Sequence, residues 1–330
     1  MKAIVTGAAG FVGSHLCAHL LDSGDEVVGI DCLTDDYDPR RKEANLATLH
    51  GRDGFTGQRV DLTAAALPTL FEDADVVYHL AGQPGLRASW GIEFLPYVKR
   101  NIVATQRVLE AAREASLWKV VYASSSSVYG DAAQCPTTEQ ALPQPISPYG
   151  VTKLAAEHLC ELYRATSGVP TVSLRLFTVY GPRQRPDMAF ARLVECALEG
   201  QPFLLYGDGE QSRDFVHVDD VVAAMRQAAL SPWSGVANIG AGTRTTMNEV
   251  LATVRRLTGG LDVVRLPAQR GDLRHAAADI SVARAGFGFD PQVALEEGLV
   301  RMIESVRDSC PAPASAWRAP LPTGSVGSVE

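Results

Sequence analysis

The chain has 330 residues, of which 46% are hydrophobic and 21% charged, and its formal net charge at pH 7 is −8. This balance fits a folded globular protein and argues against a general nucleic-acid binder, so an anionic ligand would have to be held by a few placed arginines. The six cysteines form no CxxC pair and no Cys/His cluster, which predicts neither a disulfide framework nor a metal site and fits a reducing cytoplasm. Glycines interrupt the N-terminal stretch MKAIVTGAAGFVG, and no run of about 18 apolar residues follows, so we expect no signal peptide and no membrane span.

Apolar runs alternate with helical patterns over the first 177 residues. Strands are predicted at residues 2–7, 26–31, 75–82, 119–125 and 170–177, and helices at residues 11–23, 99–115 and 148–167. Nearly continuous apolar strands that alternate with helices predict a parallel sheet covered on both faces. The expected fold class is therefore α/β, with a Rossmann doubly wound parallel sheet.

The second half of the chain is less regular. Helices are predicted at residues 188–200, 218–230 and 246–258, and strands near residues 203–206, 215–217 and 236–239. This pattern indicates a smaller mixed α/β lobe that is interleaved with the sheet. We expect a sheet domain of residues 1–177 with return segments near 214–245, a lobe of residues 178–213 and 246–310, and a disordered Pro/Ala/Gly/Ser-rich tail at 311–330.

A glycine-rich turn joins the first strand to the first helix. TGAAGFVG places Gly7, Gly10 and Gly13 there, where glycines let the backbone approach a pyrophosphate at the N-terminus of the helix. Asp31 ends the second strand, where a carboxylate accepts from both ribose hydroxyls of a dinucleotide and repels a 2′-phosphate. The turn thus predicts a dinucleotide site, and Asp31 favours NAD over NADP, although Asp31 alone also fits the cap of a loop.

Two further stretches follow strands of the predicted sheet. Asp61 follows QRV, and the turn HLAG occupies residues 79–82, where the adenine and the cofactor backbone would be contacted. We expect His79 itself to be a packed core side chain.

The stretch SPYGVTK carries a tyrosine and a lysine four residues apart. Ser147 can cap the helix that Pro148 opens, and this spacing puts Tyr149 and Lys153 on one face of it. A lysine ammonium and a positive nicotinamide ring both favour the phenolate and lower the pKa of the tyrosine. The pair therefore predicts a general base that takes a proton from a hydroxyl while hydride leaves for NAD⁺.

Six stretches together resemble the extended short-chain dehydrogenase/reductases of the nucleotide-sugar epimerase/dehydratase kind: TGAAGFVG, HLAG, ASSSSVYG, SPYGVTK, GDGEQSRDFVHVDD and RGDLRHAAADIS. The resemblance covers roughly residues 1–308. It implies tightly held NAD in the sheet domain, a UDP- or dTDP-sugar in the smaller lobe, and a homodimer formed through helices 99–115 and 149–167. The cofactor-binding residues that it implies are Gly7, Gly10, Phe11, Val12, Gly13, Asp31, Asp61, Leu62, Leu80, Ala81, Gly82, Asn101, Tyr149, Lys153 and Phe177.

The serine run ASSSSVYG bears on the outcome of the reaction. By the resemblance, Ser125 hydrogen-bonds the C4 oxygen of the sugar beside Tyr149, which makes Ser125, Tyr149 and Lys153 the catalytic set. Related 4,6-dehydratases carry Asp and Glu at the next two positions, and decarboxylating relatives carry Glu at the position of Ser127. Here Ser126 and Ser127 provide hydroxyls instead of acids, so the run is not a linker.

Three more stretches resemble UDP-glucuronate 4-epimerases: FTVYGP…RPDMA, DDYDPRRKEANLATL and AGQPGLR. The resemblance implies that Ser126, Ser127, Thr178 and Arg185 bind the sugar carboxylate, which a guanidinium reads with two hydrogen bonds. The implied reaction is NAD-dependent conversion of UDP-glucuronate to UDP-galacturonate through a 4-keto intermediate, with the carboxylate retained. The alternative for Arg185 is a surface ion pair. Leu176 departs from the aromatic residue that is frequent at its position.

Contacts to the rest of the nucleotide also follow from the resemblance. They are assigned to Arg192, Gln211, Arg213, Asp272 and Arg274. Arg192 fits a solvated helix residue equally well, and Arg87 stays open between a pyrophosphate contact and a structural ion pair.

Three other functions remain open. A UDP-glucuronate decarboxylase would give a pentose, and a neutral UDP-hexose 4-epimerase would have no use for Arg185. A catalytically silent NAD(H)-binding sensor belongs to a different class, and the intact Ser125, Tyr149 and Lys153 argue against it.

Overall fold

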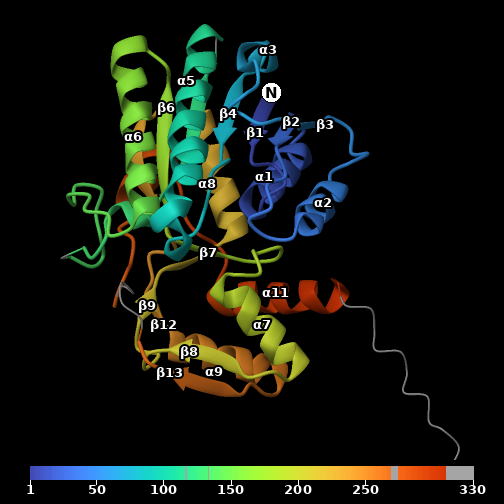
Figure 1. Ribbon diagram of the computed structural model, residues 1–330, viewed down its shortest axis with the longest axis vertical. Coiled ribbons are helices and arrows are strands. Elements are labelled where there is room, and N and C mark those ends of the chain that lie inside the picture. Colours follow the sequence, from blue (N-terminus) through green and yellow to red (C-terminus); the bar gives the residue numbers. More distant parts are fainter. Residues whose placement is uncertain (116, 133, 269–273, 310–330) are drawn as a thin grey trace, which may run out of the picture.

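The computed structural model describes residues 1–115, 117–132, 134–268 and 274–309. Within this part of the chain, seven parallel strands form the central sheet in the order β11-β6-β5-β4-β1-β2-β3 (Figure 1). The strands are β1 (Lys2–Thr6), β2 (Glu26–Asp31), β3 (Phe55–Arg59), β4 (Val76–His79), β5 (Lys119–Ser125), β6 (Thr171–Leu176) and β11 (Gly235–Ile239). The parallel sheet predicted from the alternating pattern is confirmed.

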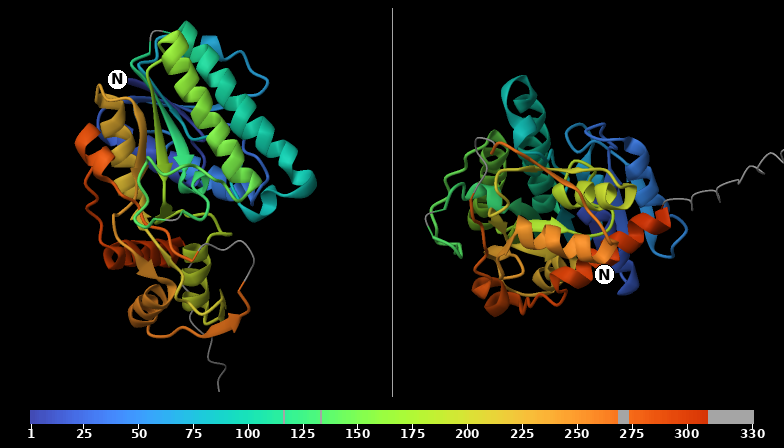
Figure 2. Two further views of the ribbon diagram at one scale, coloured as in Figure 1. Left: turned by 90° about the vertical axis from the view of Figure 1, so that its left-hand side faces the viewer. Right: turned by 90° about the horizontal axis from the view of Figure 1, so that it is seen from below.

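Helices cover both faces of this sheet, which Figure 2 shows edge-on. One face carries α1 (Phe11–Asp22), α8 (Val218–Leu230) and α10 (Ser281–Phe287), and the other carries α3 (Leu67–Phe71), α5 (Ala104–Glu114) and α6 (Pro148–Ser167). Successive strand residues point to opposite faces, so Ala3 and Val5 join the core under α1 and α8, whereas Ile4 joins the core under α5. Burial on both faces explains why the strands read as continuous apolar runs.

The ends of the helices follow from local signals. The Ser147 hydroxyl accepts from the backbone N–H of Gly150 at 3.1 Å at the start of α6, and Gly168 closes the helix in the left-handed region at φ 70°. The helix predicted over 99–115 begins instead with the short helix α4 (Phe94–Tyr97) and the π-helix η3 (Val98–Val103), from which α5 continues. Asn101 is the buried residue of this π-helical segment.

The smaller lobe lies below the sheet in Figure 1 and in the left view of Figure 2. Its core packs α7 (Ala189–Glu199), α9 (Met247–Thr258) and α11 (Leu295–Ser309) against the parallel pair β8 (Phe203–Tyr206) and β13 (Val263–Leu266). Two short pairs join the lobes: β7 (Thr178–Tyr180) with β10 (Phe215–His217), and β9 (Ser212–Arg213) with β12 (Thr245–Thr246). The mixed α/β lobe is confirmed, while the domain boundaries in the chain stay predictions.

The remaining short elements lie in the connections: α2 (Pro39–Ala47), η1 (Arg87–Ser89), η2 (Gly91–Glu93) and η4 (Ser126–Val128). Strand β3 and helix α2 had no counterpart among the predicted elements, because neither carries a clear apolar pattern. Across the described ranges, no helix is both long and apolar enough to cross a membrane. The tail predicted over 311–330 lies outside the described residues.

Candidate active site

A cavity of about 1050 Å³ lies at the carboxyl ends of the strands, where the strand order reverses between β1 and β4. This is where open α/β sheets bind ligands, and the volume suits a dinucleotide together with a second ligand. The predicted site residues that line it are Gly7, Gly10, Phe11, Val12, Gly13, Asp31, Asp61, Leu62, Leu80, Ala81, Gly82, Ser125, Ser126, Ser127, Tyr149, Lys153, Phe177, Thr178, Arg185 and Arg213.

The glycine turn forms one end of this cavity. Gly7 has φ +75°, and a Cβ built on it would lie 2.8 Å from the backbone nitrogen of Ala81. A Cβ on Gly13 would lie 2.0 Å from the carbonyl oxygen of Gly7, so neither position accepts a side chain without a shift of the backbone. Gly10 is the N-cap of helix α1 and offers no side-chain cap, and the first turn carries no acid, which leaves the N–H dipoles suited to an anion. These features fit the pyrophosphate of NAD.

Two carboxylates, at the carboxyl ends of the next two strands β2 and β3, also line the cavity. Asp31 accepts from the backbone N–H groups of Ala9 at 3.0 Å and Leu33 at 2.8 Å, so it both caps the loop and lines the cavity. Asp61 accepts from the backbone N–H and the hydroxyl of Thr63, both at 2.8 Å, and these hydrogen bonds lower the pKa of Asp61. The position of Asp31 is thus compatible with both alternatives, a contact to the ribose of the dinucleotide and the cap of a loop.

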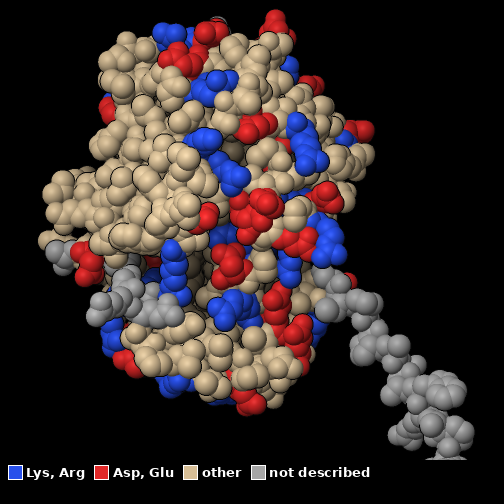
Figure 3. Space-filling model, viewed as in Figure 1, with Lys and Arg blue, Asp and Glu red and all other residues tan. Residues whose placement is uncertain are grey.

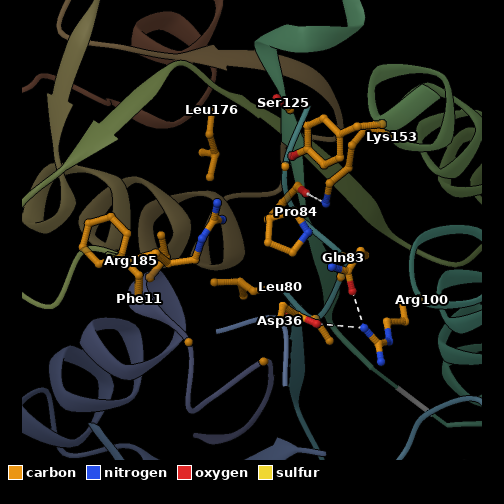
Figure 4. A pocket seen from close by; sticks show the side chains of 18 of the residues that line it. Phe11, Asp36, Leu80, Gln83, Pro84, Arg100, Ser125, Lys153, Leu176 and Arg185 are labelled. Atoms are coloured by element: carbon orange, nitrogen blue, oxygen red, sulfur yellow. Dashed lines mark hydrogen bonds and ion pairs between the residues drawn. The ribbon is translucent and has the colours of Figure 1, made fainter. Parts of the chain in front are cut away.

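Charged residues that the sequence reasoning did not single out line the same end. The buried Lys42 ammonium donates to the hydroxyl and the carbonyl oxygen of Thr34, both at 2.6 Å. Arg100 donates to Asp36 at 2.9 Å and to the side chain of Gln83, as Figure 4 shows. Thr34, Asp36 and Lys42 belong to one stretch of the chain, whereas Gln83 and Arg100 come from two others.

Asn101 and His79 lie behind the cavity wall. The side-chain oxygen of Asn101 accepts from the backbone N–H of Gln83 at 2.6 Å, and its amide donates to Thr152 at 2.9 Å. Asn101 therefore supports the loop after β4 and does not line the cavity. His79 is hydrogen-bonded to Thr6 and Thr105, and burial lowers its pKa to about 3. The expectation that His79 is a core side chain is confirmed.

Ser125, Tyr149 and Lys153 all line the cavity, and Figure 4 shows Ser125 and Lys153 on the same side of it. Burial raises the pKa of Tyr149, and a hydrogen bond with Ser125 and the charge of Arg185 oppose this shift. The Lys153 ammonium donates to the carbonyl oxygen of Ala123 at 2.9 Å, and burial lowers its pKa to about 8. The sequence predicted that Lys153 lowers the pKa of Tyr149, whereas here Ser125 and Arg185 do so, because the ammonium is directed at the strand backbone.

A buried ion pair stands behind the serine run. Arg175 on β6 donates to Glu157 on α6 with two short contacts, Nε to Oε1 at 3.0 Å and Nη2 to Oε2 at 2.8 Å. Ser124 donates to the same carboxylate. The guanidinium also stacks over the ring of Tyr129 at 4.6 Å. These contacts hold the end of β5 that carries Ser125 in place. Such anchoring is expected of a serine run in a binding site and not of a flexible linker.

The four residues predicted to bind a carboxylate share the cavity with this wall. Ser126, Ser127 and Thr178 line it, and Arg185 extends into it from the side opposite Ser125 and Lys153 in Figure 4. Arg185 also makes an ion pair with Asp187, which lines the cavity too. The two alternatives for Arg185, a site residue and an ion pair, therefore describe one arrangement.

Only some of the residues predicted to bind the nucleotide line the cavity. Arg213 lines the cavity, and so does Arg87, whose guanidinium lies 5.5 Å from the ring of Tyr206 in the smaller lobe. Arg274 forms an exposed ion pair with Asp208 at 2.9 Å. Three of the predicted residues do not line the cavity: Arg192, Gln211 and Arg274. Asp272 lies outside the described residues.

Figure 3 shows acidic and basic side chains mixed over the face that contains the junction of the two lobes. No single-sign surface dominates this face. This agrees with an anionic ligand held by placed arginines.

Comparisons with known proteins agree with this geometry. Residues 3–240 match the model of the NAD dependent epimerase/dehydratase family. A protein of Bacillus subtilis (strain 168) described as an uncharacterized UDP-glucose epimerase is 43% identical, over 92% of this chain and 97% of its own length. A UDP-glucuronate 4-epimerase of Thermodesulfobacterium geofontis (strain OPF15) is 36% identical, over 91% of this chain and 94% of its own length. The crystal structure of the UDP-glucuronic acid 4-epimerase from Bacillus cereus in complex with UDP-glucuronic acid and NAD has a TM-score of 0.90 and 41% identity, and covers 94% of this chain and 100% of that one.

Proposed function

The chain belongs to the NAD-dependent epimerase/dehydratase family and is a nucleotide-sugar 4-epimerase, and we propose that it converts UDP-glucuronate to UDP-galacturonate. The family assignment drawn from the motifs is confirmed, and so is NAD as the cofactor. The identity of the sugar is the part that we propose.

One observation carries this choice of sugar. Arg185 enters the cavity opposite Ser125 and Lys153, and the hydroxyls of Ser126, Ser127 and Thr178 line the same space. A guanidinium and three hydroxyls suit a carboxylate placed next to the reacting carbon. No acid occupies the two positions after Ser125, where loss of water or of CO₂ would call for one.

Tyr149 acts as the general base in this proposal. Its phenolate takes the proton of the C4 hydroxyl, and Ser125 holds the same oxygen by a hydrogen bond. The hydrogen bond with Ser125 and the charge of Arg185 favour the phenolate that burial disfavours. NAD, when bound against the glycine turn, supplies the acceptor and later the donor of the hydride at C4.

The carboxylate contacts decide what becomes of the 4-keto sugar. A β-keto acid loses CO₂ readily when its carboxylate bond lies perpendicular to the carbonyl plane. We propose that Arg185 and the three hydroxyls keep this bond out of that orientation. The keto sugar then turns about its bond to the diphosphate, and Tyr149 returns the proton after the opposite face has been reduced.

Proton NMR of the purified protein with UDP-glucuronate, with no cofactor added, tests the proposal. We expect UDP-galacturonate to appear, and the same final ratio of the two sugars to be reached from either one. A pentose product with release of CO₂ would favour the decarboxylase instead. No conversion even with added NAD would shift the search to neutral UDP-sugars.

A neutral UDP-hexose is the second candidate substrate. The relative described as a UDP-glucose epimerase favours it, as does the existing ion pair of Arg185 with Asp187, which leaves less need for a substrate carboxylate. A silent NAD(H)-binding sensor has less support, because Ser125, Tyr149 and Lys153 lie together.

We further propose a homodimer in the cytoplasm. The outer side of the helices η3 and α6 exposes Val103, Val151 and Leu162 at 40%, 47% and 52%, which suits helix packing against a second copy. The cysteines of the described residues are free thiols, as is usual in a reducing compartment. Light scattering at several concentrations tests the dimer, and replacement of Val151 by aspartate should shift it toward the monomer.

A further inference from the structure

Asp187 holds Arg185 along one edge of its guanidinium. Nε of Arg185 donates to Oδ1 of Asp187 at 2.9 Å, and Nη2 donates to Oδ2 at 2.8 Å. The arginine side chain is only 19% exposed, whereas that of Asp187 is 59% exposed. A largely buried cation therefore has its balancing carboxylate at the mouth of the same cavity.

The segment that carries this pair is itself fixed. The amide of the buried Gln184 donates to the carbonyl oxygen of Val179 at 3.0 Å, and its oxygen accepts from the backbone N–H of Ala191 at 2.8 Å. Gln184 thus ties the segment to β7 on one side and to α7 on the other. The backbone places Arg185 and Asp187 together before any ligand arrives.

The pairing leaves part of the guanidinium able to bind a second group. Arginine has five N–H donors in a rigid fork, and Asp187 engages the donors of Nε and Nη2 along one edge. The edge formed by Nη1 and the other side of Nη2 remains available to a sugar. Two carboxylates on one guanidinium repel each other, so Asp187 weakens the attraction of Arg185 for a substrate carboxylate.

We propose that Asp187 is a specificity-determining residue that makes the site permissive, because its carboxylate balances Arg185 when the sugar has an uncharged group at C6. Without Asp187, an uncharged sugar would leave Arg185 largely buried and unpaired, which is costly. With Asp187, the preference for a uronate over the neutral hexose is reduced. The inference rests on the proposed function, since it takes Arg185 as the residue that faces C6.

The test is the replacement Asp187→Asn, which keeps the size of the side chain and one acceptor but removes the charge. Affinities of the full-length protein with excess NAD are measured by calorimetry for UDP-glucuronate, UDP-glucose and UDP. We expect the ratio of the UDP-glucose to the UDP-glucuronate dissociation constant to rise about three- to tenfold, and UDP to bind as before. The ratio of kcat/KM for the two sugars should move in the same direction.

Two matched variants separate charge from structure. Asp187→Glu retains the charge and should stay close to the wild-type preference. Asp290→Asn removes an equally exposed carboxylate, 59%, from an ion pair with Arg284 at 2.7 Å, and should leave the preference unchanged. An unchanged or lower ratio in Asp187→Asn overturns the inference. Weaker binding of UDP itself would also overturn it, because Asp187 would then support the site as a whole.

Binding measurements keep this inference apart from the proposed function. If wild-type protein fails to convert UDP-glucuronate but Asp187→Asn shifts the binding preference, the proposed function fails and the inference stands. If wild-type protein converts UDP-glucuronate and the preference does not move, the inference alone fails. No binding of UDP-glucuronate to either form would overturn both.

Discussion

The two walls of the cavity are built in different ways. Ser125, Tyr149 and Lys153 stand on β5 and α6, and the buried Glu157–Arg175 pair fixes this wall from behind. Arg185 stands opposite, on a connection between β7 and α7, and its partner Asp187 is largely exposed. The first wall is set by regular structure and burial, whereas the second depends on a charge balance that a ligand can change. We therefore expect changes on the first wall to abolish turnover or folding, and changes on the second to alter substrate choice.

The replacement Tyr149→Phe should show the largest effect. It removes the general base, and we expect kcat to fall by about 10²–10⁴-fold. Turnover of UDP-glucuronate is followed by NMR, with calorimetric binding of UDP as the control for an intact site. A loss of less than about tenfold would mean that another group takes the C4 proton.

Replacing Glu157 by glutamine tests the support behind the first wall. Arg175 would stay buried with its carboxylate gone, so we expect the free energy of unfolding to fall by about 3–5 kcal/mol, measured by urea denaturation. The double variant Glu157→Gln/Arg175→Met should recover much of this loss. If Glu157→Gln is as stable as wild type, the pair does not hold this wall.

The single variant Glu157→Gln has an expected pH dependence. Burial lowers the pKa of Lys153 to about 8, and Glu157 opposes this shift. Removal of the Glu157 charge should lower the pKa of Lys153 further. If the reaction needs a protonated Lys153, the alkaline loss of kcat/KM moves to lower pH. A shift to higher pH would contradict this role of Glu157.

Arg185→Ala tests the opposite wall. We expect kcat/KM for UDP-glucuronate to fall by about 10–100-fold, with most of the change in KM, while UDP-glucose is affected less. Arg185→Lys keeps the charge without the planar fork, so its kcat/KM for UDP-glucuronate should lie between those of wild type and Arg185→Ala. Unchanged turnover and affinity in Arg185→Ala would show that the carboxylate assignment is wrong.

An effect on stability alone is expected in the sheet beneath the site. His79 is buried, and its pKa lies at about 3 in the fold against 6.5 in the unfolded chain, so between these values the unfolded chain binds the extra proton. Lowering the pH from 6.5 to 5 should therefore cost about 2 kcal/mol of stability through His79 alone. His79→Gln should flatten the dependence of unfolding free energy on pH, whereas the exposed His50→Gln should not. Equal slopes in both variants would exclude His79 as the source.

The contrast between the walls also explains what could be predicted from the sequence. The glycine turn, the capped helix α6 and the buried strands are local patterns, and all three are confirmed. The roles of the catalytic and binding residues stay predictions. Strand β3, FTGQR, was missed because it is an edge strand without an apolar run.

Other features depend on segments that only the fold brings together. Arg100 reaches Asp36 from a segment more than 60 residues away in the chain. The Lys153 contact with Ala123 joins a helix to a strand. Spacing along the chain carries no signal for such contacts, so the sequence predicted the residue types in the site better than their partners.

The position of β11 has a consequence for biosynthesis. This strand, Gly235–Ile239, pairs with β6, although about 60 residues that build other parts of the molecule lie between them in the chain. While the polypeptide is being made, the edge of β6 therefore remains without its neighbour until the ribosome has passed β11. An open strand edge is a template for pairing with other chains, so a product truncated before Gly235 should aggregate rather than fold as a smaller sheet.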